Sequence, residues 1–116
     1  MKRIYHLGSC STCKRIIGEL KPKSDVILQD IKTEKITESQ LDEMKALAGS
    51  YEALFSRVAL KYRAMGLHEK QLTEKDYKKL ILEEYTFLKR PVIVLNDKIF
   101  VGNSKKTVEA AKALMK

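Results

Sequence analysis

Apolar and polar positions change their period several times along the chain, and these changes divide it into predicted strands and helices. Residues 2–7 are an apolar, aromatic run typical of a strand, whereas residues 11–20 place apolar side chains at helical spacing. Residues 25–31 are rich in Val and Ile and predict a second strand. A strand, a helix and a strand in this order predict a βαβ unit with parallel strands and a right-handed crossover.

The middle of the chain changes to a helical period and shows no convincing strand. Thr37–Gln40 resembles a capping box, and apolar residues follow it on one helical face. The spacing of apolar residues across 51–58 begins a second helical pattern, which Leu60, Tyr62 and Met65 continue less regularly, and Gly66 marks its end. Thr73–Asp76 predicts the start of a third helix. We therefore expect an all-helical insert at about residues 37–86.

The last part of the chain returns to a period of two. Val92–Leu95 and Lys98–Val101 predict two strands, and the two residues between them predict an antiparallel hairpin. A final helix follows, and its predicted inward positions are Val108, Ala111, Leu114 and Met115. The order of elements predicts an α/β fold in one domain of residues 1–116, with a four-stranded mixed sheet and the helical insert.

Both cysteines of the chain, Cys10 and Cys13, fall at the first predicted strand-to-helix junction. The free N–H groups and the positive dipole end of a helix favour an anion, and Lys14 and Arg15 add positive charge. Because the thiolate is the nucleophilic form of cysteine, we interpret Cys10 as a thiol of lowered pKa backed by Cys13. A pair of buried structural cysteines is the alternative. C-x-x-C at this place is typical of a thioredoxin-like redox motif.

Charge and length narrow the classes of function. The chain of 116 residues has a formal net charge of +8, but its lysines are spread over the polar sides of the periodic segments. We interpret this charge mainly as a solvated surface, with an anionic substrate or an acidic protein partner as the alternative, and expect no direct nucleic-acid binding. The absence of a long apolar run and of a signal region predicts a cytoplasmic protein without a membrane partner.

The cysteine motif and several motifs elsewhere in the chain match one known family. They are Tyr5-His6 before Cys10–Lys14, Arg57 ahead of Tyr62, Leu88–Val94 before the hairpin, and Phe100–Gly102 after it. Over nearly its whole length the chain resembles the arsenate reductase (glutaredoxin-coupled) and Spx-like family, a branch of the thioredoxin fold with a helical insert.

The resemblance implies roles for individual residues. Cys10 would be the redox nucleophile of a thiol oxidoreductase, with Cys13 as its resolving thiol. Arg90 would bind an oxyanion such as arsenate, and Arg57 in the insert would assist it. Pro91 would be a cis proline that faces the cysteines. An external thiol, either glutathione with glutaredoxin or thioredoxin, would act as the reductant.

The residues around the cysteines have plainer alternatives. Ser11, Thr12 and Lys14 are candidates for substrate binding, although the first two could simply fill the turn, and Arg90 could be a surface arginine. His6 could tune the thiol or be a core histidine. It offers only a third ligand beside the two cysteines, whereas a structural zinc site needs four, so we expect no metal and no bound cofactor.

A second class of function fits the same motif. Spx-like members of the family carry C-x-x-C and act as thiol-switched partners of RNA polymerase, whereas glutathione-coupled arsenate reductases usually have no cysteine at the position of Cys13. The latter also carry an arginine near the last hairpin, which residues 98–103 lack. The two hypotheses are therefore an enzyme that reduces a small oxyanion or a redox protein, and a regulator that binds RNA polymerase.

Overall fold

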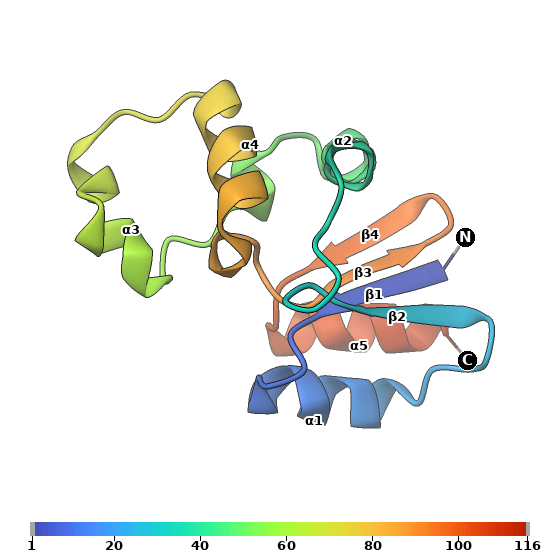
Figure 1. Cartoon of the computed structure of the whole chain (residues 1–116). Helices are drawn as coiled ribbons and strands as arrows, with labels where there is room; N and C mark the ends of the chain where they lie inside the picture. Colours follow the sequence, from blue (N-terminus) through green and yellow to red (C-terminus); the bar gives the residue numbers. More distant parts are fainter. Residues whose placement is uncertain (1, 116) are drawn as a thin grey trace. The chain divides into compact units, whose positions relative to one another are not determined.

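The computed structural model describes residues 2–115 and divides the chain into two compact units. One unit combines residues 1–35 with residues 90–116, and the other comprises residues 36–89. The first holds all the strands of the sheet, and the second holds the helical middle of the chain (Figure 1).

The sheet of the first unit has the strand order β2-β1-β3-β4. Its bounds are β1 Lys2–His6, β2 Val26–Asp30, β3 Val92–Leu95 and β4 Lys98–Val101. β1 pairs with β2 in parallel, and both β1–β3 and β3–β4 are antiparallel, so the predicted mixed sheet is confirmed. The β3–β4 hairpin turns at Asn96, which adopts a left-handed backbone conformation with φ 60°.

Two helices cover one face of this sheet: α1, Ser11–Leu20, and α5, Lys105–Leu114 (Figure 1). The buried core between helices and sheet comes from alternate strand positions and from one face of each helix. Its members are Ile4, Ile16, Leu20, Ile93, Leu95, Val108 and Ala111. This packing fixes the start of α1 against the end of β1, where the cysteines lie.

The ends of the helices follow local sequence signals. α1 ends at Leu20 because Lys21 turns left-handed with φ 48° and Pro22 cannot continue the helix. α5 begins at its N-cap Ser104, whose hydroxyl accepts a hydrogen bond from the Thr107 N–H. Of the four inward positions predicted for this helix, Leu114 is wrong, because its side chain is 55% exposed.

The second unit contains short helices joined by turns. Its α-helices are α2 Glu38–Ala48, α3 Leu60–Ala64 and α4 Glu74–Glu83, and its 3-10 turns are η1 Glu52–Leu54, η2 Leu67–Glu69 and η3 Tyr85–Phe87. Capping boxes at Thr37 and Thr73 start α2 and α4, as their sequences predict. Gly66 adopts a left-handed conformation with φ 69° just after α3.

The second predicted helical pattern is confirmed only in its later part, where α3 forms, and is wrong over residues 51–58. The segment forms only the turn η1 and then extends, with Phe55 in an isolated antiparallel bridge to Leu88. The Phe55 ring stacks on Phe87 with centroids 5.1 Å apart, and Val58 is 90% exposed. The apolar spacing thus reflects an aromatic cluster and an exposed loop rather than one helical face.

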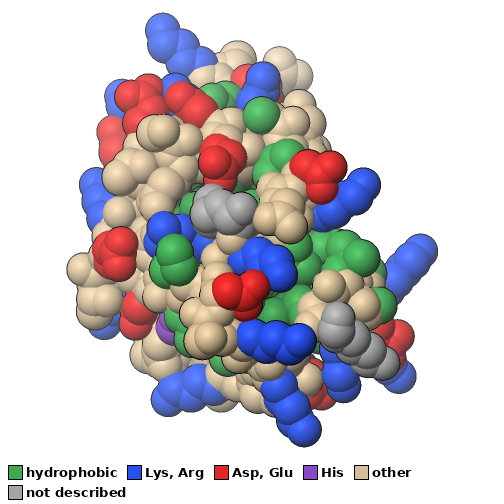
Figure 2. Space-filling view, turned by 90° about the vertical axis from the view of Figure 1, so that its right-hand side faces the viewer, with side chains coloured by type: hydrophobic (Ala, Val, Ile, Leu, Met, Phe, Trp, Pro, Cys, Tyr) green, Lys and Arg blue, Asp and Glu red, His purple; other side chains and the backbone are tan. Residues whose placement is uncertain are grey.

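Basic side chains are dispersed over the surface. Figure 2 shows lysine and arginine side chains scattered over the visible face among acidic ones, without one continuous basic patch on that face. The distribution agrees with the interpretation of the positive charge as a solvated surface.

Two isoleucines of the sheet provide a test of this arrangement. Ile93 on the interior strand β3 is completely buried, whereas Ile27 on the edge strand β2 is 46% exposed. Ile93→Ala should lower the free energy of unfolding by about 2–5 kcal/mol, because it leaves a cavity in the core. The matched control Ile27→Ala should cost less than about 1 kcal/mol. Urea denaturation measures both, and equal losses would contradict the strand order.

Candidate active site

A tight turn delivers the first cysteine to the start of α1. The Cys10 N–H donates a hydrogen bond to the Leu7 carbonyl at 3.0 Å, which closes a turn through Gly8 and Ser9. Cys10 is then the N-cap of the helix, and its own carbonyl accepts the Lys14 N–H at 3.1 Å. The sequence-based placement of Cys10 in the turn is therefore confirmed.

The two cysteines differ in burial. Both are free, but Cys13 is completely buried under the first turn of α1, whereas Cys10 is half-buried. Only Cys10 therefore presents its sulfur partly to solvent.

The environment of Cys10 favours its charged form. Burial opposes ionisation, but hydrogen bonds from the backbone N–H and the thiol of Cys13 and from the Thr12 N–H act against burial. The positive charge of Arg90 adds to them, and together they lower the pKa of Cys10. The Cys10 side chain makes no formed capping hydrogen bond. The Thr12 and Cys13 N–H groups instead favour the thiolate, which is the form that the positive end of the helix stabilises.

Cys13 has the opposite tendency. Burial raises the pKa of its thiol, and the hydrogen bond and negative charge of Cys10 raise it further. A backbone hydrogen bond from Leu7 and the charge of Arg90 oppose this shift without overcoming it. The surroundings of the pair thus favour ionisation of the partly exposed sulfur and disfavour it at the buried one.

Arg90 acts on this pair from the same unit, and Pro91 follows it in the chain. The Arg90–Pro91 peptide bond is cis, as the family resemblance implies. Pro91 is buried, and its carbonyl accepts the Gly102 N–H at 2.9 Å, which ties this segment to the end of β4. The guanidinium of Arg90 acts electrostatically on both sulfurs, so the structure brings Arg90 together with Cys10 and Cys13.

The other predicted residues of the turn differ in their surroundings. Ser11 and Lys14 are exposed on the first turn of α1, while Thr12 is half-buried and directs its backbone N–H toward the Cys10 sulfur. These three residues surround the start of the helix beside Cys10. Their role toward a substrate stays a prediction.

Arg57 belongs to the second unit and has partners there. Its Nη2 donates to the Glu52 carboxylate at 2.7 Å and to the Tyr77 hydroxyl at 2.9 Å. The guanidinium also lies 5.6 Å from the centroid of the Tyr77 ring. Within this unit the arginine fastens the loop after η1 to α4. Its assistance to an oxyanion stays a prediction.

One carboxylate at this end of the sheet has no role in the sequence analysis. Asp30, the last residue of β2, is opposite His6 in the parallel register and accepts a hydrogen bond from the Gly8 N–H. His6 is half-buried beside it. The register of a parallel pair cannot be read from the two strand sequences alone, so no local signal identifies Asp30.

The described residues hold neither a cluster of metal ligands nor a helix that could cross a membrane. Across residues 2–115, no three His, Cys, Asp or Glu side chains gather as metal ligands would. None of the helices in this described part of the chain is long and apolar enough to cross a membrane.

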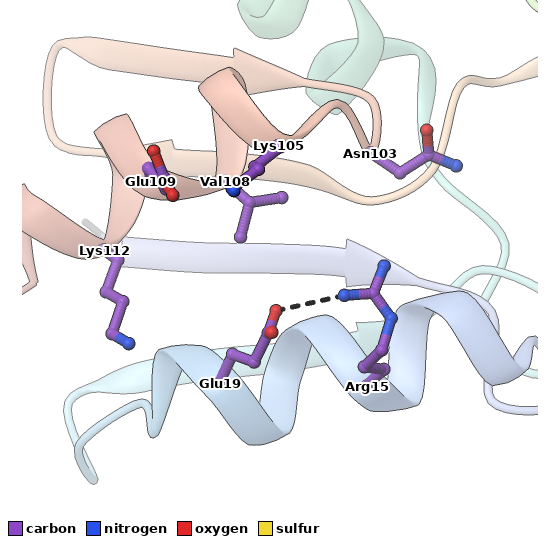
Figure 3. Close-up of a pocket in the computed structure, with 7 residues that line it drawn as sticks. All are labelled: Arg15, Glu19, Asn103, Lys105, Val108, Glu109 and Lys112. Atoms are coloured by element: carbon purple, nitrogen blue, oxygen red, sulfur yellow. Dashed lines mark hydrogen bonds and ion pairs between the residues drawn. The ribbon is translucent and has the colours of Figure 1, made fainter.

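A hollow of about 460 Å³ lies between α1 and α5 (Figure 3). Its lining is mixed in charge and comprises Arg15, Glu19, Asn103, Lys105, Val108, Glu109 and Lys112. Arg15 and Glu19 form an ion pair of 3.3 Å across its α1 side, as Figure 3 shows. Neither cysteine lines this hollow.

Comparison with solved structures shows the fold. The YFFB protein superposes with a TM-score of 0.81 at 22% sequence identity, over 100% of both chains. Arsenate reductase from Vibrio cholerae gives a TM-score of 0.79 at 18% identity, over 95% of this chain and 96% of that one. An arsenate reductase (ArsC) related protein from Brucella melitensis gives 0.72 at 24% identity, over 94% and 92%. The fold is therefore α/β and thioredoxin-like.

Sequence comparison adds the family. No curated protein sequence matches the chain. The family model described as "ArsC family", however, matches residues 5–111, which is nearly the whole chain and includes both cysteines and Arg90. The protein belongs to the ArsC family.

Proposed function

We propose that the protein is a thiol-dependent oxidoreductase in which Cys10 is the nucleophile and Cys13 the resolving thiol. The observation that carries this proposal is the asymmetry of the pair: the pKa of the partly exposed Cys10 is lowered, and that of the buried Cys13 is raised. Ionisation is thus favoured at the accessible sulfur and disfavoured at the buried one, which is the division of roles between a nucleophile and a resolving thiol.

Arsenate is the first candidate substrate, because relatives in fold include arsenate reductases. The Cys10 thiolate attacks arsenic(V) and forms a sulfur–arsenic bond, while one arsenic-bound oxygen takes up protons and leaves as water. A second thiolate, from Cys13 or an external thiol, then attacks the Cys10 sulfur. The sulfur–arsenic bond breaks, its electron pair stays on arsenic, and arsenite(III) leaves while the two sulfurs become a disulfide.

Arg90 has the charge and the position to assist the first step. Its planar guanidinium is permanently charged and suits an oxyanion, and it already acts on both sulfurs. Ser11, Thr12 and Lys14 are the further candidates for binding the anion near Cys10. Arg57, in the second unit, is a further candidate for binding the anion. It would first have to give up its hydrogen bond to Glu52 or to Tyr77.

Regeneration needs electrons from outside the chain. The Cys10–Cys13 disulfide is reduced by an external thiol, for which glutathione with glutaredoxin and thioredoxin are the two candidates. Each supplies two electrons and two protons to the disulfide by thiol–disulfide exchange. The partner in this step is therefore a redox protein or a small thiol.

The same pair supports a second candidate, a thiol switch that regulates a protein partner such as RNA polymerase. In that case the disulfide forms but does not turn over, and the loss of the Cys10 charge changes a binding surface. The observation that favours this candidate is the position of Cys10: its sulfur is partly exposed and favours the charged form, so disulfide formation removes a charge at the protein surface.

The low-pKa role of Cys10 predicts a specific effect of Arg90. In a Cys13→Ser background only Cys10 reacts, and its alkylation should titrate below about 8.5, the pKa of an ordinary thiol. Arg90→Gln should raise this pKa, because it removes a positive charge that favours the thiolate. Iodoacetamide rates as a function of pH measure both effects.

The matched control is Arg15→Gln. The sequence places Arg15 among the positive charges near Cys10, but in the structure this exposed arginine of α1 pairs with Glu19 and is not among the groups that lower the pKa of Cys10. This control should leave the titration of Cys10 unchanged. An ordinary midpoint near pH 8.5 in the protein with Arg90 intact would rule out the nucleophile as proposed.

Turnover separates the two candidate functions. With arsenate and either reductant system, the unmodified protein should produce arsenite, and Cys10→Ser should lose all activity. Cys13→Ser should keep the attack of Cys10 on arsenate but stop forming the intramolecular disulfide. Mass spectrometry of the quenched reaction detects the disulfide or a mixed disulfide on Cys10.

A thiol switch gives a different pattern. The protein would show no turnover with arsenate, with glutathione and glutaredoxin, or with thioredoxin. It would instead be captured by RNA polymerase in only one redox state. That combination would favour the regulator over the enzyme as the function of the protein. If RNA polymerase captured the protein in neither redox state, the regulator hypothesis would be ruled out.

A further inference from the structure

The parallel strands β1 and β2 end side by side, just before the turn from Leu7 to Cys10 leaves β1. His6 ends β1 and Asp30 ends β2, and the two residues are register partners. The Ile31 N–H donates to the His6 carbonyl at 2.8 Å, so the pairing continues one residue beyond the strand. Asp30 is therefore held in place by the sheet at the point where the chain leaves β1 for Cys10.

The carboxylate of Asp30 uses both of its oxygens. Oδ1 accepts the Lys32 N–H at 3.0 Å, which closes the turn after β2. Oδ2 lies against Gly8 in the turn from Leu7 to Cys10, where the Gly8 N–H favours the ionised carboxylate. One side chain thus binds the backbone of two different segments.

Gly8 is the residue that this contact requires. A Cβ added at Gly8 would lie 2.4 Å from Oδ2 of Asp30, far inside van der Waals contact. A side chain at this position would push either the carboxylate or the turn away. The glycine is therefore explained by the close approach of the carboxylate rather than by an unusual φ, because Gly8 is not among the glycines with positive φ.

We propose that Asp30 is a positioning residue that holds the turn from Leu7 to Cys10 through the Gly8 N–H. The Cys10 N–H and the Leu7 carbonyl close this turn at 3.0 Å, so fixing Gly8 fixes where the Cys10 sulfur stands at the start of α1. The inference deepens the proposed function, since it rests on Cys10 being the reactive sulfur. Asp30 itself touches neither substrate nor sulfur in this role.

The proposal requires a carboxylate rather than an amide. An asparagine has one acceptor oxygen, and its NH₂ group would face an N–H donor in place of the second oxygen. The pKa of Asp30 is held below its ordinary value, first by the Lys32 N–H, whose effect is larger than that of burial. The Gly8 N–H and the nearby His6 lower this pKa further. Asp30 is therefore ionised and able to accept both bonds at neutral pH.

Charge and position predict opposite effects on Cys10. A negative charge near a thiol disfavours the thiolate, so if Asp30 acted only as a charge, its removal would lower the pKa of Cys10. If Asp30 positions the turn, its removal misaligns the Thr12 and Cys13 N–H groups with the sulfur, and the pKa of Cys10 rises. The sign of the shift thus separates positioning from simple electrostatics.

The test uses Asp30→Asn in a Cys13→Ser background, where only Cys10 is alkylated. We expect the midpoint of the pH–rate profile to rise and the rate at about pH 7 to fall roughly threefold to tenfold. The control is Asp25→Asn, on the exposed stretch just before β2, which removes an ion pair of 3.1 Å to Lys2. It should leave the profile unchanged. An unchanged or lowered midpoint in Asp30→Asn would overturn the proposal.

A second variant guards against a failure to fold. Gly8→Ala leaves the carboxylate intact but introduces the Cβ that would meet Oδ2. Gly8→Ala should raise the midpoint of the Cys10 pH–rate profile, as Asp30→Asn does. The rise caused by Gly8→Ala should be smaller in a protein that already carries Asp30→Ala, because the two residues act through one contact. Equal rises with and without the Asp30 side chain would contradict the coupling.

The result is independent of turnover. A protein whose Cys10 shifts as described but which reduces no substrate would retain the positioning role of Asp30 and lose the proposed enzyme function. A protein that turns over normally with an unshifted Cys10 in Asp30→Asn would retain the function and lose the positioning role.

Discussion

The candidate site depends on one interaction, the stabilisation of a negative charge on the Cys10 sulfur by the start of α1. The first N–H groups of a helix have no partner within the helix, and no acidic residue occupies the first turn of α1 to take them. A thiolate at the N-cap supplies the missing negative charge. Arg90 strengthens the same preference from the segment before β3. The rest of the first unit serves to hold these groups in one place.

The core beneath the sheet provides that rigidity. Ile16 and Leu20 of α1 pack with Ile4 and Ile93 of the two interior strands, so the helix cannot shift relative to β1 without opening a buried cluster. Cys13 is part of the buried face of α1. Its burial therefore has two consequences: it helps to anchor the helix, and it keeps its own thiol protonated beside the reactive sulfur.

The sequence was sufficient for the elements that carry local signals. The helix over residues 11–20 was predicted with its observed bounds, because it begins at a turn and ends before a proline. The capping boxes at Thr37 and Thr73 were equally informative. The prediction failed over residues 51–58, where burial of Phe55 arises from its bridge to Leu88 rather than from a helical face. Such long-range contacts leave no periodic signal.

The candidate site was predictable only where its residues carry a local sequence signal or match the family. Cys10 and Cys13 stand in a recognisable local motif, and Arg90 follows from the resemblance to a family that the chain proves to belong to. Asp30 could not be found, because its importance comes from register and from a contact with Gly8 across the sheet. A carboxylate at the end of a strand is otherwise unremarkable in sequence.

The central claim is that the two sulfurs have opposite protonation preferences, and nuclear magnetic resonance can observe each of them directly. Selective ¹³Cβ labelling of cysteine in the reduced, unmodified protein allows both thiols to be titrated in the same sample. The account predicts that the Cys10 resonance titrates below the range of an ordinary thiol and the Cys13 resonance above it. Coincident titrations, or Cys13 ionising first, would contradict it.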